Sequence, residues 1–488
     1  MNEELNRAFE QISDELINEA AGYQKKRFPW VKSVVTLVGV ILAWVAIWGA
    51  FDFKPPFIVP DPSGTVLQDT TPSAAPTAPT TTPTVPTSPS TPLTPTLMYF
   101  SGLAAEPSYP KKTNIHAEQM FDIYHDLNDF WHTSIPEFLS GNGNRTYSPT
   151  NVYMAMAMLA QTSSGQSQQQ ILDLLGVETI EDLQSQVRSV WNAHYIYDKY
   201  SNLLLGNSLW LDSNFHYNPE IVKALADSYF ASVYAGDLGS DEMNETLRQW
   251  VDSQTENLLQ EDSSNLELDP NTVFALASTV YFKADWNQPF SESKTFNQTF
   301  HGTNGDVSIP FLHGSSTASS YYWGEDFTAV RMPLDWGNSM WIILPDEGKK
   351  PDDLLESGAY LSTVLPTEVV ENVSYPTIHL SMPKFDISEK RDLVNGMKNL
   401  GITDVFSPYT SNFSSFTDEN IYVDKIEHTV RVSVDEEGVL GAAYTIVDAP
   451  SYGIPPEDEV DFVVDRPFLF LVTSYHGFPL FAGVVEQP

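Results

Sequence analysis

The chain has 488 residues and a formal net charge of −39, with 25 Lys and Arg residues against 64 Asp and Glu residues. A surface this acidic repels polyanions, so neither nucleic acid nor heparin is expected as a partner. The chain contains no cysteine, which excludes disulfides, zinc-thiolate sites and a cysteine nucleophile. Its length allows a large core and two or three domains.

The N-terminal region predicts a cytoplasmic tail (residues 1–32) followed by a transmembrane helix (residues 33–51). The second segment has 19 residues without a charge, enough for a helix that crosses the hydrocarbon layer. The positive-inside bias places the N-terminus in the cytoplasm and the rest of the chain outside, because four basic residues stand just before the apolar run: Lys25, Lys26, Arg27 and Lys32. A cleaved signal peptide is the alternative, but the apolar run is too long and no small-residue cleavage pattern follows it.

Residues 52–112 are expected to form a linker. Within it, residues 70–96 contain eight prolines and eleven threonines in 27 positions. That composition cannot build a core and favours extended polyproline II. The linker is therefore expected to be a stalk that holds the following domain away from the membrane.

Residues 113–488 have the pattern of a globular α+β domain with several long strands. Helices are predicted at residues 114–139, 152–159 and 166–176, the last one ended by Gly176. The first of these helices should carry one apolar face: Phe121, Tyr124, Leu127, Phe130 and Trp131. Strands are predicted at residues 203–211, 273–283, 326–333, 339–345, 377–384, 421–434 and 460–474.

The motifs of common enzymes are missing from this sequence. It has no G-x-S-x-G elbow, HExxH helix, phosphate loop or dinucleotide fingerprint, and its ten histidines show no metal-ligand spacing. These absences do not by themselves exclude catalysis, but they agree with the expectation of a protein that is not an enzyme and that needs no metal or cofactor. Five N-x-Ser/Thr sequons are consistent with an exported glycoprotein: Asn144, Asn244, Asn297, Asn372 and Asn412.

From about residue 114 onwards the chain resembles a serpin, a member of the serine protease inhibitor superfamily. Six stretches in the expected order carry the resemblance: SPTNVYMAMAMLAQTSSGQSQQQILDLLG (148–176), TVFALASTVYFKADWNQPF (272–290), MWIILPDEGKK (340–350), IHLSMPKFDISEKRDLVNGMKNLGITDVFS (378–407), IEHTVRVSVDEEG (426–438) and DRPFLFLVTSYHGFPLFAGVV (465–485). The resemblance implies multi-stranded mixed β-sheets surrounded by helices, with an exposed reactive loop. A protease that cleaves this loop would be trapped while the hinge side of the loop inserts into a large sheet.

The resemblance places the hinge between residues 436 and 445, with these matching residues: Glu436, Glu437, Gly438, Val439, Gly441, Ala442, Ala443 and Thr445. Gly438 is expected to permit a backbone turn there. The attacked residue lies about fourteen positions past the hinge glycine in this family, which gives Tyr452–Gly453 as the reactive bond. A tyrosine at this position implies a chymotrypsin-like or subtilisin-like protease.

The hinge sequence suits a strand that enters a sheet. Side chains alternate between the faces of a strand, and every second residue from 439 is small or β-branched and uncharged: Val439, Gly441, Ala443, Thr445, Val447 and Ala449. Two residues depart from the family pattern on the other face, where Leu440 replaces an acid and Tyr444 replaces a small residue. These departures weaken the inference of inhibition without excluding it.

Serpins close the sheet with a buried polar cluster, and four residues match its positions: Ser148, Asn151, Ser278 and His428. Family members carry serine where Asn151 stands and asparagine where Ser278 stands. The two residues could therefore have exchanged roles, or either could face elsewhere. Trp286 matches the tryptophan near the point where the loop enters the sheet, and core packing alone would also explain it.

The sequence thus predicts a membrane-tethered, extracellular, monomeric serpin that inhibits a serine protease by forming a covalent complex. Three alternatives stay open. The chain could be a non-inhibitory serpin, a cell-surface adhesion or binding module, or a hydrolase without a familiar motif.

Overall fold

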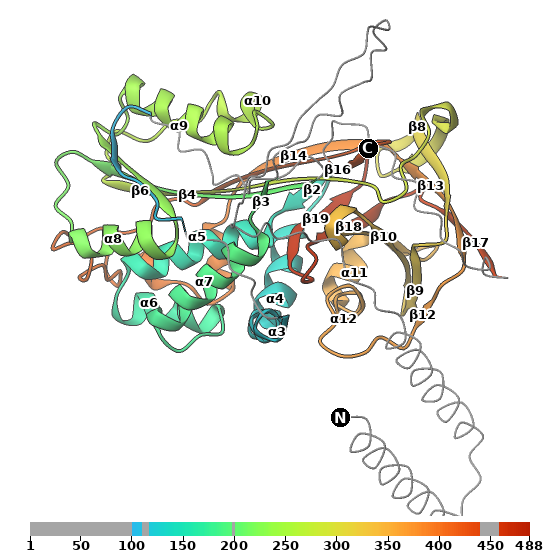
Figure 1. The fold of residues 1–488 in the computed structure, drawn as a ribbon, viewed down its shortest axis with the longest axis horizontal. Coiled ribbons are helices and arrows are strands. Elements are labelled where there is room, and N and C mark those ends of the chain that lie inside the picture. Colours follow the sequence, from blue (N-terminus) through green and yellow to red (C-terminus); the bar gives the residue numbers. More distant parts are fainter. Residues whose placement is uncertain (1–99, 110–116, 198–200, 440–457) are drawn as a thin grey trace, which may run out of the picture. The chain divides into compact units, whose positions relative to one another are not determined.

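The computed structural model describes residues 100–109, 117–197, 201–439 and 458–488 (Figure 1). The described α-helices are α3 (Ala117–Asp126), α4 (Asn128–Leu139), α5 (Pro149–Thr162), α6 (Gly165–Leu174), α7 (Ile180–His194), α8 (Pro219–Ser228), α9 (Asp241–Gln254), α10 (Gln260–Ser263), α11 (Pro351–Ser357), α12 (Leu361–Val364) and α13 (Val394–Asn399). Three short 3₁₀ turns add to them: η1 (Glu292–Lys294), η2 (Asp335–Gly337) and η3 (Asp404–Phe406).

An eight-stranded sheet, called the large sheet below, spans the described domain in the order β1-β5-β4-β6-β16-β15-β14, with β3 paired to β4. Its strands are β1 (Leu103–Ala105), β3 (Ile196–Tyr197), β4 (Ser201–Asp212), β5 (Ala231–Gly236), β6 (Phe274–Asp285), β14 (Phe385–Asp392), β15 (Glu427–Val434) and β16 (Gly438–Val439). Figure 1 shows α9 and α10 on one face of this sheet and α5 to α8 on the other.

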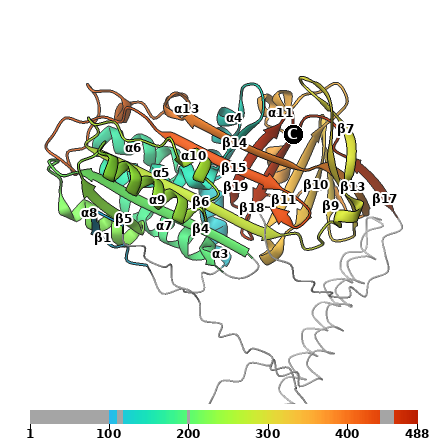
Figure 2. The same ribbon diagram turned by 90° about the horizontal axis from the view of Figure 1, so that it is seen from above.

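Two further sheets complete the domain. The seven-stranded sheet consists of β12 (Val373–Ser374), β9 (Ser320–Gly324), β10 (Phe327–Pro333), β11 (Ser339–Pro345), β18 (Phe468–Thr473), β19 (Pro479–Val485) and β2 (Arg145–Tyr147). The four-stranded sheet consists of β17 (Glu459–Val463), β13 (Thr377–Pro383), β8 (Gly305–Ser316) and β7 (Phe296–Gly302). Figure 2 shows both sheets at the end of the domain opposite α6 and α8.

The core forms where apolar runs lie between the sheets and helices. Every residue of β18 and β19 is buried, which explains why these strands read as continuous apolar runs rather than alternating ones. β15 instead alternates buried and half-buried residues, because only one face of the large sheet rests on the main core at that point.

Most of the predicted elements are confirmed. Five predicted strands correspond to β4, β6, β10, β11 and β13: those at residues 203–211, 273–283, 326–333, 339–345 and 377–384. The helix predicted at 152–159 lies within α5, and the one predicted at 166–176 corresponds to α6, which ends at Leu174. The predicted strand 421–434 is shorter, since β15 begins only at Glu427. The run 460–474 is two strands in different sheets, β17 and β18, separated around Pro467, whose ring removes a ladder hydrogen bond.

The first predicted helix is wrong in two details. It is divided at Leu127 into α3 and α4, where the backbone leaves the helical region (φ −85°, ψ 0°) while the side chain stays buried. Phe121 is 56% exposed, so the buried face does not pass through it. The other four predicted residues, Tyr124, Leu127, Phe130 and Trp131, are buried as expected, and Met120 and Ile123 join them on the inward face.

Candidate functional site

The hinge strand β16 lies between β6 and β15 in the large sheet and is only two residues long. It runs antiparallel to both neighbours. Gly438 pairs with Asp285 and Val439 with Ala284 on β6, and Val439 also pairs with Val434 on β15. The chain therefore begins to enter the sheet as a new strand at this point.

Gly438 is required here because the chains are close together. A Cβ on this residue would lie 2.2 Å from the carbonyl oxygen of Ala284 and 2.8 Å from the Cα of Asp285, both of which are backbone atoms. Gly438 lies in strand β16 and is not among the described glycines with a positive φ, so a left-handed backbone conformation is not the reason for this glycine. The glycine instead lets the hinge strand approach β6.

Trp286 holds the segment that leads into the hinge. Its indole N–H donates to the carbonyl of Asp435 at 2.9 Å, and its backbone N–H donates to that of Glu437 at 2.8 Å. The backbone N–H of Phe290 donates to the carbonyl of Glu436 at 3.0 Å. Trp286 is only 3% exposed, so it packs in the core and contacts the hinge at the same time.

The two acidic residues before Gly438 differ in their surroundings. Glu437 is exposed, whereas Glu436 is half-buried and accepts hydrogen bonds from the Lys384 ammonium at 2.5 Å and from the Thr295 hydroxyl at 2.8 Å. Partial burial opposes ionisation of Glu436, but these two hydrogen bonds outweigh it and hold its pKa below the usual value. Glu436 therefore ties the start of the hinge to the residues that stand directly before β14 and β7.

Below the hinge the large sheet has a gap. Among the described strands, β6 and β15 are connected only through β16 and do not pair with each other. A cavity of about 10 Å³ lies between them, lined by Val280 of β6, Arg431 of β15 and Ser148 and Asn151 of the α5 N-terminus. The two strands on either side of β16 are thus already separated below it.

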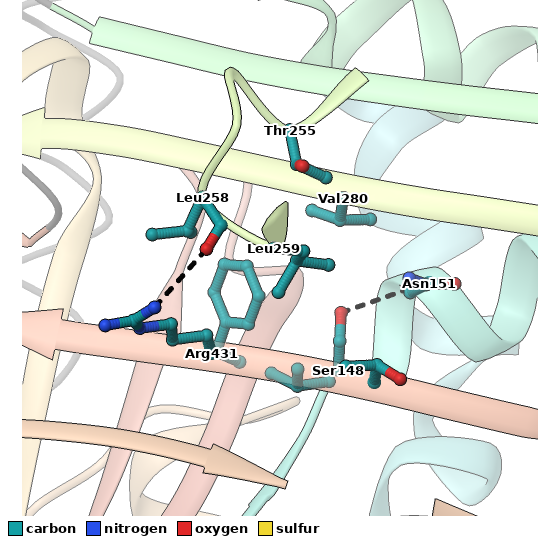
Figure 3. A pocket seen from close by; sticks show the side chains of 10 residues that line it. Ser148, Asn151, Thr255, Leu258, Leu259, Val280 and Arg431 are labelled. Carbon is teal, nitrogen blue, oxygen red and sulfur yellow. Dashed lines mark hydrogen bonds between the residues drawn. The ribbon is translucent and has the colours of Figure 1, made fainter. Parts of the chain in front are cut away.

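The segment between α9 and α10 covers this gap. Leu258 and Leu259 lie between β6 and β15 in Figure 3, with Thr255 beside them, and all three line the small cavity. The Arg431 guanidinium donates to the carbonyl of Leu258 at 3.5 Å. We call residues 255–259 the plug segment.

The plug segment contains unfavourable backbone conformations. Glu256 and Asn257 have φ values of 50° and 64°, a region that residues other than glycine rarely adopt. Such residues cost on the order of 1–3 kcal/mol each unless their surroundings hold them in place. The turn that covers the gap is therefore under strain.

The structure brings His428 and Ser148 together under the sheet (Figure 3 shows Ser148). The backbone N–H of Ser148 donates to Nε2 of His428 at 3.1 Å, and the Ser148 hydroxyl donates to the carbonyl of Leu480 at 2.7 Å. Ser148 also caps α5, because its oxygen accepts the Asn151 N–H at 3.4 Å. Burial lowers the pKa of His428 to about 3, with Arg391 adding to the effect, so the imidazole is neutral and accepts at Nε2.

The other two predicted cluster residues, Asn151 and Ser278, form no hydrogen bond with each other in the described part of the chain. Asn151 is buried next to Ser148. The Ser278 hydroxyl is buried without a hydrogen-bond partner. The two residues have therefore not exchanged roles through a mutual bond in this state of the molecule.

Sequence reasoning missed several residues of the site. Asn207 pairs with Ser278 across β4 and β6, and its Oδ1 atom is also buried without a partner. Lys384 and Thr295 bind Glu436, and Leu258 and Leu259 cover the gap. No local pattern identifies these residues, because each one acts on a segment far away in the sequence.

Much of the predicted reactive loop falls outside the described residues. This applies to the following positions: Leu440, Gly441, Ala442, Ala443, Tyr444, Thr445, Tyr452 and Gly453. The predicted tail, transmembrane helix and stalk lie outside them as well. Within the described ranges, no helix combines the length and apolar character that a membrane crossing requires.

Comparison with known protein families assigns the globular domain to one family. The family model for serpins, described as serine protease inhibitors, matches residues 127–488. The chain therefore belongs to the serpin family. The α+β serpin fold expected from the sequence is confirmed, and so is the family itself.

Individual relatives agree with this assignment. The chain is 30% identical over 373 residues to Serpin-ZX of Arabidopsis thaliana, covering 72% of this chain and 93% of that protein. It is 28% identical over 357 residues to the leukocyte elastase inhibitor of Homo sapiens, with coverages of 71% and 93%. The structure of the thermophilic serpin Tengpin in its native state superposes with a TM-score of 0.68 at 23% identity, covering 79% of this chain and 98% of that one, which shows a shared fold.

Proposed function

We propose that this chain inhibits a serine protease by acting as its suicide substrate. The observation that carries the proposal is the position of β16, which starts a strand between two separated neighbours in the large sheet. An ordinary surface module does not need an unpaired gap below a two-residue strand. The gap has a use if residues after Val439 fill it following cleavage.

Extending the register of β16 shows how the loop would fit. Val439 pairs with Ala284 and Val434, so residue-by-residue continuation places Thr445 between Ser278 and His428. In this register, Val439, Gly441, Ala443 and Thr445 lie opposite the buried residues of β15, so their side chains would face the core. They belong to the small and β-branched set predicted from the sequence. Thr445 would also bring a hydroxyl to the unpartnered hydroxyl of Ser278, where each satisfied buried group contributes about 1–3 kcal/mol.

The chemistry belongs to the attacking protease. Its serine oxygen would bond to the carbonyl carbon of Tyr452, the bond to the Gly453 nitrogen would break, and that nitrogen would take up a proton. Insertion of the hinge side would then drag the acylated protease along and distort its active site before water releases it. A tyrosine side chain suits a deep apolar specificity pocket, which favours chymotrypsin-like or subtilisin-like proteases.

A denaturing gel tests the proposal. A soluble chain that starts at Met98 is mixed with chymotrypsin and, separately, with subtilisin. We expect a band at the summed mass and a released peptide that begins at Gly453. Clean cleavage at Tyr452–Gly453 with no summed band would contradict inhibition of these proteases.

Two neighbouring substitutions separate insertion from cleavage. Ala443→Glu would place a charge between Val280 and Val430 in the extended register, on the core side, at a cost of several kcal/mol (~2–5). Ala442→Glu would place the same charge beside Arg431, on the other face. We expect both variants to be cleaved but only the second to keep the summed band, and equal behaviour of the two would contradict the register.

One observation favours a second candidate, a non-inhibitory serpin. In the extended register Tyr444 lies beside Thr279, on the face covered by α9, and Thr279 is already buried. Leu258 and Leu259 also occupy the entrance to the gap. If these obstacles delay insertion, the protease completes hydrolysis, and the gel shows cleavage without a complex.

Attachment to a membrane through residues 33–51 is part of the proposal, with the serpin domain monomeric and outside the cell. The support is the charge-free run and the basic residues before it. The test is external protease treatment of intact cells that express the full chain with tags at both ends. Loss of the C-terminal tag with retention of the N-terminal tag is expected, and protection of both tags would contradict this topology.

The sequons are not equivalent as glycosylation sites. The Asn144 amide donates to the Gln487 carbonyl at 2.6 Å and the Asn244 amide to the Gly239 carbonyl at 3.3 Å. Asn297 and Asn372 are exposed, whereas Asn412 is half-buried. We propose Asn297 and Asn372 as the glycosylated residues, which glycopeptide mass spectrometry would identify.

A further inference from the structure

A second cavity lies beside the hinge and has no part in the mechanism above. Its volume is about 170 Å³. Its lining comes from the segment after β6 and from β8, β10 and β13, and includes Trp286, Phe290, Lys294, Gly314, Met332 and Leu380. We call it the hinge cavity.

The walls of the hinge cavity suit an aromatic ring. Trp286 and Phe290 meet edge to face at 5.8 Å between ring centroids. Met332 and Leu380 are 5% and 6% exposed and supply apolar surface. The rest of the lining is more polar and includes Gln288, His313, Ser315, Ser316 and Ser319. A volume of roughly 150 Å³ is enough for benzene, so the hinge cavity has room for one ring against its apolar side and a small polar substituent against the other.

The charge at the cavity selects an anionic substituent. Lys294 is the only lysine or arginine among the described lining residues, and no aspartate or glutamate is among them. Lys294 lies in the exposed turn η1, and its ammonium forms no ion pair with a described residue. Because the described lining contains this lysine and no carboxylate, an anionic substituent meets a positive charge here, whereas most of the acidic surface of the chain would repel it.

The cavity also shares its walls with the hinge contacts. Trp286 and Phe290 line it with their side chains, and the same two residues hold the carbonyls of Asp435, Glu436 and Glu437. A ligand packed against these rings restricts their movement. The hinge segment that they bind is restricted with them.

We propose that the hinge cavity binds a small aromatic carboxylate and that binding stabilises the hinge strand β16 in its present position. The binding itself does not depend on inhibition. The coupling deepens the proposed function, since it acts on the hinge from which insertion would start.

Ligand-observed fluorine NMR tests the binding, with 4-fluorophenylacetate as the probe and the soluble chain from Met98. We expect line broadening with a Kd on the order of 1 mM, as the size of the ligand allows. Gly314→Leu should abolish the broadening, because a Cβ at Gly314 already reaches 2.9 Å from Cε1 of Phe290. Ser308→Leu, an exposed change in the same strand β8, is the matched control. No broadening with the unmodified chain, or equal broadening with both variants, would overturn the proposal.

A change at Lys294 tests the charge without risk to the fold, because this side chain is exposed. The unmodified chain should bind 4-fluorophenylacetate roughly two- to fivefold more tightly than 4-fluorophenylacetamide, the range of an exposed ion pair. Lys294→Gln should remove this preference while binding of the amide stays the same. A preference that persists in the variant would show that Lys294 is not the anion's partner.

Hydrogen exchange tests the coupling in the absence of any protease. With saturating phenylacetate, the amides of Glu437, Gly438 and Val439 should exchange at least about threefold more slowly, and Gly314→Leu should abolish this effect. Binding without added protection would overturn the coupling. If the gel experiment fails while this protection is observed, the proposed inhibition is wrong and the ligand site remains.

Discussion

Asp285 carries an unfavourable charge beside the hinge strand. It pairs with Gly438, and its Oδ1 atom is buried without a hydrogen-bond partner. Burial raises its pKa, the nearby carboxylates of Asp335, Glu437 and Asp435 raise it further, and Lys283 partly offsets the effect. A carboxyl group whose pKa is raised on folding makes the folded state less stable at neutral pH.

Asp285→Asn should therefore stabilise the folded chain at pH 7. The gain should fade as the pH falls through the raised pKa, because protonation removes the same charge from the unmodified residue. Urea unfolding of both proteins between pH 7 and pH 3 measures it. Lys283→Gln is the opposing variant and should destabilise the chain at pH 7, whereas a stabilising effect of Lys283→Gln would contradict the assigned electrostatics.

His428 makes the cluster under the large sheet sensitive to acid. Its folded pKa of about 3 lies below the unfolded value of about 6.5. Its stabilising contribution is therefore complete above pH 6.5 and is lost as the pH falls towards 3, by at most about 1.4 kcal/mol per pH unit. Protonation at Nε2 also breaks the hydrogen bond from Ser148.

His428→Asn keeps a group that can accept this hydrogen bond but does not titrate. Between pH 6.5 and pH 5 the unmodified chain should lose about 2 kcal/mol more unfolding free energy than the variant. Urea titrations at the two pH values give the comparison. His194, whose pKa burial also lowers to about 3, is present in both proteins and cancels. Equal pH slopes would mean that His428 is not neutral in the folded chain.

At the level of elements, the plug segment is the obstacle to a new strand. Leu259 is 8% exposed and packs with the buried residues of α9, including Leu247 and Trp250. It also lines the gap between β6 and β15. The strained residues Glu256 and Asn257 lie just before it, so the segment is held in place by these contacts rather than by its own backbone preference.

Leu259→Ala should open the gap to an added strand. A synthetic peptide with the sequence of residues 439–449 should then associate several times faster than with the unmodified chain, which a thermal shift followed over time detects. Leu247→Ala, which removes a leucine buried in the same cluster but outside the gap, should lose a similar 2–5 kcal/mol of stability without faster uptake. Equal acceleration by both variants would point to general loosening of the α9 layer.

For the whole molecule, the gap and the unpartnered groups of Ser278 and Asn207 leave unused pairing capacity in the described part of the large sheet. The proposed function predicts that the fold stops short of its most stable arrangement. An inserted strand would pair with β6 and β15 on both sides. With about ten residues inserted and roughly 1 kcal/mol per net hydrogen bond, the stabilisation exceeds the usual effect of a point mutation many times over.

Cleavage at Tyr452–Gly453 should therefore raise the melting temperature by at least about 10 °C. Calorimetry of the soluble chain before and after limited proteolysis measures this rise. The Ala443→Glu chain, treated in the same way, should show little or none. A cleaved chain that melts at the original temperature would show that the loop stays out of the sheet.

The sequence predicted features that depend on local patterns. The alternation of small residues after Gly438 follows from the two-residue period of a strand, and the register of β16 is consistent with it. The long strands and buried helices were recognisable for the same reason. The local pattern did not decide whether Phe121 is buried, nor that residues 460–474 are two strands separated around Pro467. Packing against other elements decided both.

By itself the sequence determined the family, the order of the main elements and the alternation that suits the hinge to insertion, because these depend on neighbouring residues along the chain. Only the tertiary structure decided why residue 438 is a glycine, which residues bind Glu436, and that Leu258 and Leu259 close the gap. The physical reason is that each of these depends on a contact or on burial between segments far apart in the chain. Such contacts leave no periodic trace in either partner.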